Sequence, residues 1–143
     1  MQAESLTELD GLIVSVLERV IPFQRGFLTY QLPNGDWKLV LFPSGDSWER
    51  KHVRDMLHLA LRSDHLMTAA NSQQDPSLGQ ALDGLPDSRV LLPLRTDDLT
   101  LGAVFLLSRQ APFDHQATDF LSLFGDIAAL AILNCARLEL SNL

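Results

Sequence analysis

The sequence predicts an α+β domain whose central antiparallel sheet of about five or six strands carries the N- and C-terminal helices on one face. Three observations predict this fold. Helical patterns stand at both ends of the chain, two pairs of β-type runs lie between them, and a short turn joins each pair. Because short turns connect antiparallel neighbours, the pairs form hairpins, and an irregular segment between them is left to cover the other face as a lid.

The first element is a helix that begins after Ser5. Ser5 and Glu8 have the spacing of a capping box, in which both side chains satisfy free amides of the first turn. Apolar residues then recur at helical spacing as far as Val20 and cover an arc of roughly 200°, against the roughly 100° of a one-sided helix. Pro22 ends the helix because it has no backbone N–H to donate. We expect this helix to bury two faces.

Two alternating runs follow at residues 26–32 and 37–42. Asn34-Gly35 lies between them and predicts a hairpin turn, since this dipeptide tolerates positive φ. A second helix is predicted at about 48–62, because its apolar residues recur on a single face. That face consists of Val53, Met56, Leu57, Ala60 and Leu61.

Residues 63–87 form the least regular stretch of the chain. Their pattern favours a short strand at 66–70, a loop at 71–76 and a short helix at 77–82. Loops of this length are uncommon inside compact domains and often carry binding residues. We therefore expect the segment to act as a lid, and a tolerated surface insertion is the alternative.

Residues 89–94 and 99–107 are two apolar β runs joined by a short turn, which predicts a second hairpin. Gly102 lies inside the second run, where glycine indicates a bulge or the close approach of another segment. Asp114 is expected to cap a last helix that runs to about Leu140 and again carries an apolar arc of roughly 200°.

The composition excludes several classes of protein. The chain has 143 residues, 46% hydrophobic and 20% charged, which is typical of one folded domain and not of a disordered segment. The net charge is −7 and the cations are scattered, so we expect no nucleic-acid partner. The longest apolar run has seven residues and no secretion signal opens the chain, so neither a membrane span nor export is expected. One cysteine allows no disulfide framework, and we expect a cytoplasmic protein.

No set of residues has the spacing of a catalytic or metal-binding site. The sequence contains no Gly-rich phosphate loop, no zinc-ligand spacing and no Gly-x-Ser-x-Gly elbow. His115 and Cys135 are about 30 Å apart by helical rise and cannot pair. His52 and His58 are out of phase on one helix and cannot chelate one metal ion. The chain is therefore expected not to be an enzyme and to use no metal or cofactor.

Three segments resemble the GAF domain family of small-molecule sensor modules. Residues 87–94 are similar to the strand of that family that ends in a hydrophobic-Pro-Leu step, and residues 102–107 to its glycine-led strand. Residues 113–136, which end in Ala-Ile-Leu-Asn-Cys-Ala, are similar to its closing helix. The resemblance covers about residues 5–140, and it favours this family over PAS domains, which share the architecture but usually lack such a helix.

The resemblance implies a regulatory domain, and residues 1–143 are interpreted as one GAF-like domain excised from a larger signalling protein. Its output domain would be a histidine kinase, cyclase, phosphodiesterase or transcription activator. The family binds ligands between the sheet and a lid, here residues 64–82. The asparagine-lysine-phenylalanine-aspartate-glutamate signature of the cyclic-nucleotide group is absent, and Cys135 lies in the closing helix. The resemblance therefore implies neither a cyclic nucleotide nor a covalent bilin.

Seven polar residues are candidates for the ligand site, chosen for their predicted positions near the lid and the sheet. They are Tyr30, His65, Thr68, Asn71, Asp75, Ser88 and Arg89. Arg89 can pair bidentately with a carboxylate or a phosphate, and a solvent-facing salt bridge is its alternative role.

The two apolar arcs need more cover than one sheet face offers, which predicts that the terminal helices pair with those of a second copy. The residues predicted at this homodimer interface are Leu9, Leu12, Val16, Leu123, Ile127 and Leu130. In the alternative, the two helices bury each other within a monomer. The predicted function is a non-catalytic sensory domain that binds an unknown small ligand and signals to its output domain through the last helix. A structural dimerisation domain with a filled pocket is the alternative function.

Overall fold

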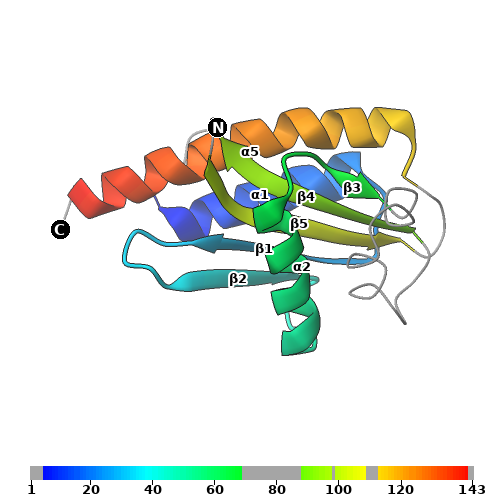
Figure 1. Cartoon of the computed structure of the whole chain (residues 1–143), viewed down its shortest axis with the longest axis horizontal. Coiled ribbons are helices and arrows are strands. Elements are labelled where there is room, and N and C mark those ends of the chain that lie inside the picture. Colours follow the sequence, from blue (N-terminus) through cyan, green and yellow to red (C-terminus); the bar gives the residue numbers. More distant parts are fainter. Residues whose placement is uncertain (1–4, 69–87, 98, 109–112, 142–143) are drawn as a thin grey trace.

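The computed structural model describes residues 5–68, 88–97, 99–108 and 113–141 (Figure 1). Its elements are α1 (Leu6–Val20), β1 (Arg25–Gln31), β2 (Trp37–Phe42), α2 (Arg50–Arg62), β3 (Met67–Thr68), β4 (Ser88–Thr96), β5 (Leu99–Ser108) and α5 (His115–Ser141). The strands form one five-stranded sheet in the order β2-β1-β5-β4-β3, and every neighbouring pair is antiparallel. The predicted α+β class and both predicted hairpins are confirmed.

Helices cover both faces of the sheet. α1 contributes Leu9, Ile13 and Leu17 to a core that it shares with α5 on one face. α2 contributes Met56 and Ala60 to a second core on the opposite face. Figure 1 shows this arrangement, with α2 crossing in front of the sheet and α1 behind it. The prediction that the terminal helices share one face is confirmed, and α2, which the sequence assigned to neither face, covers part of the other.

The predicted lid at residues 64–82 is described only as far as Thr68. Within the strand expected at 66–70, the structure describes β3 at Met67–Thr68, which pairs with β4 at the edge of the sheet. Residues 69 and 70 lie outside the described residues. The helix expected at 77–82 lies outside the described residues.

Polar side chains begin both terminal helices where the sequence places them. Ser5 Oγ accepts a hydrogen bond from the backbone N–H of Glu8 at 3.2 Å, at the start of α1. Asp114 Oδ1 accepts one from the backbone N–H of Ala117 at 2.8 Å, at the start of α5. Gly35 has a φ of 93° in the turn between β1 and β2, the left-handed region that the Asn-Gly dipeptide tolerates.

Helix α5 meets the length and composition of a membrane span over His115–Glu139, which the longest uninterrupted apolar run did not reveal. In its most apolar window, 44% of the residues are buried inside the domain. The core helix of a soluble protein meets the same test, so the finding is weak evidence for a span.

Candidate functional site

Strand alternation divides the predicted ligand residues between the two faces of the sheet. Tyr30 belongs to the core beneath α1 and α5. Thr68 lies opposite Val90, a residue of the same core, and Ser88 precedes Val90 by two positions, which places both on that face. Arg89 falls on the opposite face, towards α2, because successive strand residues alternate.

His65 lies in the connection between α2 and β3. Its Nδ1 is 2.8 Å from Asp64 Oδ1, and its side chain is 65% exposed. Asn71 and Asp75 lie outside the described residues. The five predicted ligand residues that the structure describes are therefore divided between the two faces of the sheet and an exposed connection, and they do not share one pocket. Within the described part of the chain, no group of three or more His, Cys, Asp or Glu side chains is placed to hold a metal ion.

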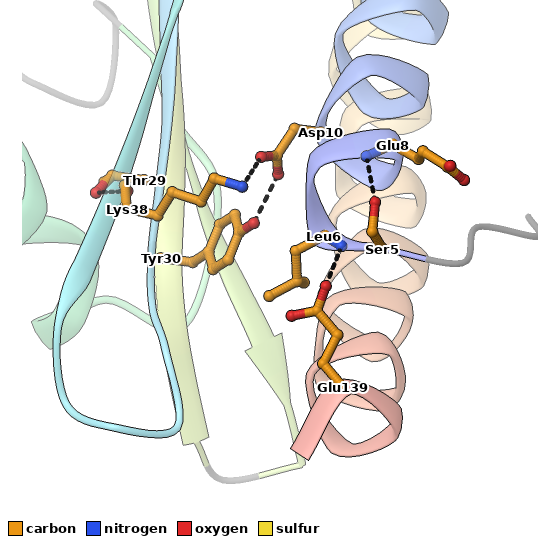
Figure 2. Close-up of polar contacts among 8 residues, drawn as sticks. All are labelled: Ser5, Leu6, Glu8, Asp10, Thr29, Tyr30, Lys38 and Glu139. Carbon is orange, nitrogen blue, oxygen red and sulfur yellow. Dashed lines mark hydrogen bonds and ion pairs between the residues drawn. The ribbon is translucent and has the colours of Figure 1, made fainter. Parts of the chain in front are cut away.

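Tyr30 belongs to a polar network, centred on the buried Asp10 carboxylate, that sequence reasoning missed (Figure 2). Its hydroxyl donates to Asp10 Oδ1 at 2.7 Å, and Lys38 Nζ lies 2.6 Å from Asp10 Oδ2. Tyr30 is 0% exposed, so it has no surface through which to contact a ligand. A signal for this network was present in the sequence, since Asp10 stands on the apolar stripe of α1 between Leu6 and Ile13.

Burial and the adjacent Asp10 carboxylate raise the pKa of Tyr30 well above its usual value of about 10. In the unfolded chain tyrosine loses its proton above about pH 10, whereas the folded chain keeps it. The contribution of Tyr30 to the free energy of unfolding is therefore fully present below about pH 10 and falls as the pH rises above that value.

An alkaline titration tests this network, because Tyr30 is the only tyrosine in the chain. We expect the absorbance of tyrosinate to rise only together with the loss of helical circular dichroism. Tyr30→Phe should reduce the alkaline loss of stability, since no tyrosine then ionises in the unfolded chain. A tyrosinate signal at about pH 10 from a protein that is still folded would contradict the network.

A second polar contact ties the start of α1 to the end of α5. The backbone N–H of Leu6 donates to Glu139 Oε1 at 2.8 Å (Figure 2). Cys135 lies one turn earlier on α5 and is buried. Its burial, with the nearby carboxylates of Glu139 and Asp10, raises the pKa of the thiol. The thiol therefore stays protonated and packs as a small apolar group.

Aromatic side chains fill the centre of the sheet face towards α2. Trp48 packs edge-on against Phe27 and Phe105, with ring centroids 5.4 and 5.7 Å away. The Arg25 guanidinium lies 4.4 Å from the Trp48 ring centroid, and its Nε donates to Asp46 Oδ2 at 2.6 Å. This hydrogen bond lowers the pKa of the Asp46 carboxyl. Phe27 and Phe105 are 0% exposed. A ligand could therefore reach the sheet here only by displacing the side chains of the protein that cover it.

An exposed apolar stripe runs along α5 on the side away from the sheet. Leu123, Ile127 and Leu130 are 64%, 50% and 52% exposed. They follow the i, i+4, i+7 spacing of one helix face. Leu12 of α1 is also exposed, at 39%. These four residues, all predicted at the dimer interface, are exposed on the two helices, and we call them the outer apolar surface of α1 and α5.

The other two predicted interface residues lie differently. Leu9 is 1% exposed and belongs to the core of its own chain, so the prediction that it contacts a second copy is corrected. It faces the sheet because it is on the same side of α1 as Ile13 and Leu17. Val16 is partly buried against that core.

The chain is similar to one family of known proteins: the GAF domain model matches residues 6–132. Among solved structures, a methyl-accepting chemotaxis protein aligns with a TM-score of 0.70 at 14% identity, over 95% of this chain and 93% of that chain. A GAF domain of a two-component sensor histidine kinase from Bacillus halodurans aligns with a TM-score of 0.61 at 21% identity, over 99% and 100% of the two chains.

A GAF domain from Synechocystis sp., in its photoproduct state, aligns with a TM-score of 0.60 at 11% identity, over 94% of this chain and 98% of that one. At these identities the solved structures show a shared fold. No curated protein matches the chain.

Proposed function

Because this chain belongs to the GAF domain family, we propose that it is a non-catalytic sensory domain that dimerises through the outer apolar surface of α1 and α5. In this proposal a small ligand biases the sheet, and α5 carries the change to an output domain of a larger signalling protein. We place this protein in the cytoplasm. GAF domains generally serve as sensory or regulatory modules, which supports this function over an enzymatic one.

The observation that carries the proposal is the exposure of Leu123, Ile127 and Leu130 on a helix whose opposite side is packed on the sheet. A contiguous apolar stripe on a folded domain marks an interaction site. Two copies related by a two-fold axis bury the same stripe on both chains, since such an interface is self-complementary. Antiparallel or parallel pairing of α5 with its copy then forms a helical bundle.

The proposed dimer is tested by Leu130→Glu in the middle of the stripe. Burying this carboxylate in an apolar interface is unfavourable, so we expect the dissociation constant of the dimer to rise at least about tenfold. The matched control is Leu61→Glu, the same change at an exposed leucine of α2, where the side chain is 39% exposed. Sedimentation equilibrium over a range of protein concentrations measures the dissociation constant of the dimer for both variants and for the wild-type chain. A wild-type chain that stays monomeric, or equal weakening by both variants, would contradict the proposed interface.

A second function is favoured by the filled face beneath α2. If Trp48, Phe27 and Phe105 occupy the space that a ligand would take, the chain serves as a structural dimerisation domain. Thermal unfolding with small-molecule libraries separates the two functions. A sensor gains about 2.7 kcal/mol when its ligand is present at a hundredfold excess over the dissociation constant, and a filled domain gains nothing.

A further inference from the structure

Arg95 stands in the wall of a cavity of about 210 Å³ at the β3–β4 edge of the sheet. Its Nη1 donates to the carbonyl oxygen of Ser63 at 3.0 Å and to Thr100 Oγ1 at 3.1 Å. Both acceptors are neutral, and among the described residues the charge of the guanidinium meets only the electrostatic attraction of the Asp64 carboxylate, to which it makes no hydrogen bond. The two bonds fix the plane of the side chain, at the point where the register of β4 and β5 shifts between Leu94 and Arg95.

The other edge of the guanidinium, formed by Nε and Nη2, makes no hydrogen bond or ion pair within the described part of the chain. This edge presents two parallel N–H donors, the arrangement that binds a carboxylate bidentately. Because the Nη1 bonds already hold the side chain in place, little side-chain entropy is lost when a ligand binds. The geometry is that of a prepared anion site.

The opposite charge in the cavity comes from α5. Asp126 lines the same cavity, is exposed, and has no ion pair among the residues that the structure describes. Asp64 also lines the cavity, but its carboxylate is already bonded to His65 Nδ1 at 2.8 Å. The Nε–Nη2 edge of Arg95 and the carboxylate of Asp126 therefore both line the cavity without a side-chain partner among the described residues.

We propose that this cavity binds a small amino acid, with its carboxylate on the Nε–Nη2 edge of Arg95 and its ammonium group on Asp126. The volume of about 210 Å³ suits such a ligand, being below the roughly 300–1,000 Å³ of pockets that hold drug-sized molecules. An anion without an ammonium group is disfavoured, because two carboxylates line the same space. The apolar part of the wall, including Leu92, accepts a short side chain.

The effect of the bound amino acid on signalling rests on the proposed sensory function. Ser122 and Asp126 place α5 in the wall of the cavity, so a bound amino acid contacts directly the helix that we propose carries the signal. The proposed amino-acid site does not use the side chains packed on the sheet face towards α2, so binding leaves that packing intact.

The probes are L-alanine and propionate, which differ by the ammonium group, titrated into the full chain by calorimetry and by amide chemical shifts. We expect saturable binding of L-alanine and at least about tenfold weaker binding of propionate. Asp126→Asn removes the partner of the ammonium group and should weaken L-alanine binding by about tenfold or more. Asp119→Asn, the same change at an exposed position of the same helix outside the cavity, should leave binding unchanged.

Arg95→Lys tests the other end of the ligand, because lysine keeps the charge but loses the two parallel donors. We again expect at least about tenfold weaker binding of L-alanine, with the unfolding transition measured to show that the variant is folded. Absence of L-alanine binding at millimolar concentration, or equal binding of propionate, would overturn the inference. Sedimentation of the same samples keeps the two proposals apart: an intact dimer that ignores L-alanine overturns the amino-acid site alone, and a monomer that binds it overturns the dimer alone.

Discussion

Gly102→Ala is expected to lower the free energy of unfolding by about 3 kcal/mol or more, at the upper end of the cost of overpacking. A Cβ at this position would meet the carbonyl oxygen of Thr29 and would lie 2.6 Å from Tyr30 Cα. Both are backbone atoms of β1, which pairs with β5 here, so they cannot move without opening the ladder. Urea unfolding followed by circular dichroism measures the loss.

Gly11→Ala is the control for this substitution. Gly11 is exposed on α1, and a Cβ there meets nothing within 4 Å. Alanine in a helix interior costs less backbone entropy than glycine, so we expect this variant to gain about 0.5–1 kcal/mol. A loss below about 1 kcal/mol in Gly102→Ala would show that the two strands lie farther apart than the structure places them.

Lys38→Met is expected to cost about 3 kcal/mol of stability, because it leaves the buried Asp10 carboxylate without the partly exposed cation that pairs with it. The Asp10 side chain is 7% exposed. Without Lys38, the remaining side-chain partner of its carboxylate is the Tyr30 hydroxyl, which donates a hydrogen bond but carries no charge. Lys51→Met, at an exposed lysine of α2, serves as the control and should change stability by less than about 0.5 kcal/mol. Chemical unfolding of both variants at neutral pH gives the comparison.

The triple variant Asp10→Leu, Tyr30→Phe, Lys38→Met distinguishes a buried charge from simple loss of packing. It replaces the whole network with apolar groups, and such replacements are often neutral or stabilising. We expect it to regain most of the stability that Lys38→Met loses. If the triple variant is less stable than Lys38→Met, the stability lost in Lys38→Met comes from the lost packing of the lysine side chain and not from the uncompensated Asp10 carboxylate.

The order and type of the elements were predictable from the sequence because their signals act over a few residues. The Asn34-Gly35 turn, the caps at Ser5 and Asp114, and the helical spacing of apolar residues are each confirmed at their predicted places. Gly102 was predicted to mark a bulge or a close approach, and the contact with β1 confirms the close approach. The buried Cys135 follows from its place on the apolar arc of the last helix.

The candidate sites were harder to predict because they depend on which distant segments meet. Tyr30 was placed in a ligand site, but its hydroxyl is taken by Asp10, twenty positions earlier. Arg89 was chosen for its guanidinium, whereas the arginine that lines the cavity at the β3–β4 edge is Arg95. Both arginines lie on β4, and no local pattern tells which of them stands in the wall of a cavity.

The sequence by itself determined the helices, the hairpins and the α+β class, because capping, turn conformation and periodicity are local and nearly independent of the rest of the chain. The family was indicated separately, by the resemblance of residues 87–94, 102–107 and 113–136 to its segments. The tertiary structure alone decided that Leu9 faces the sheet, that Lys38 reaches Asp10 across Tyr30, and that α5 supplies a wall to the Arg95 cavity. These contacts join residues far apart along the chain. Their geometry is set by strand order and by how the helices pack on the sheet, which appear only when the whole core is assembled.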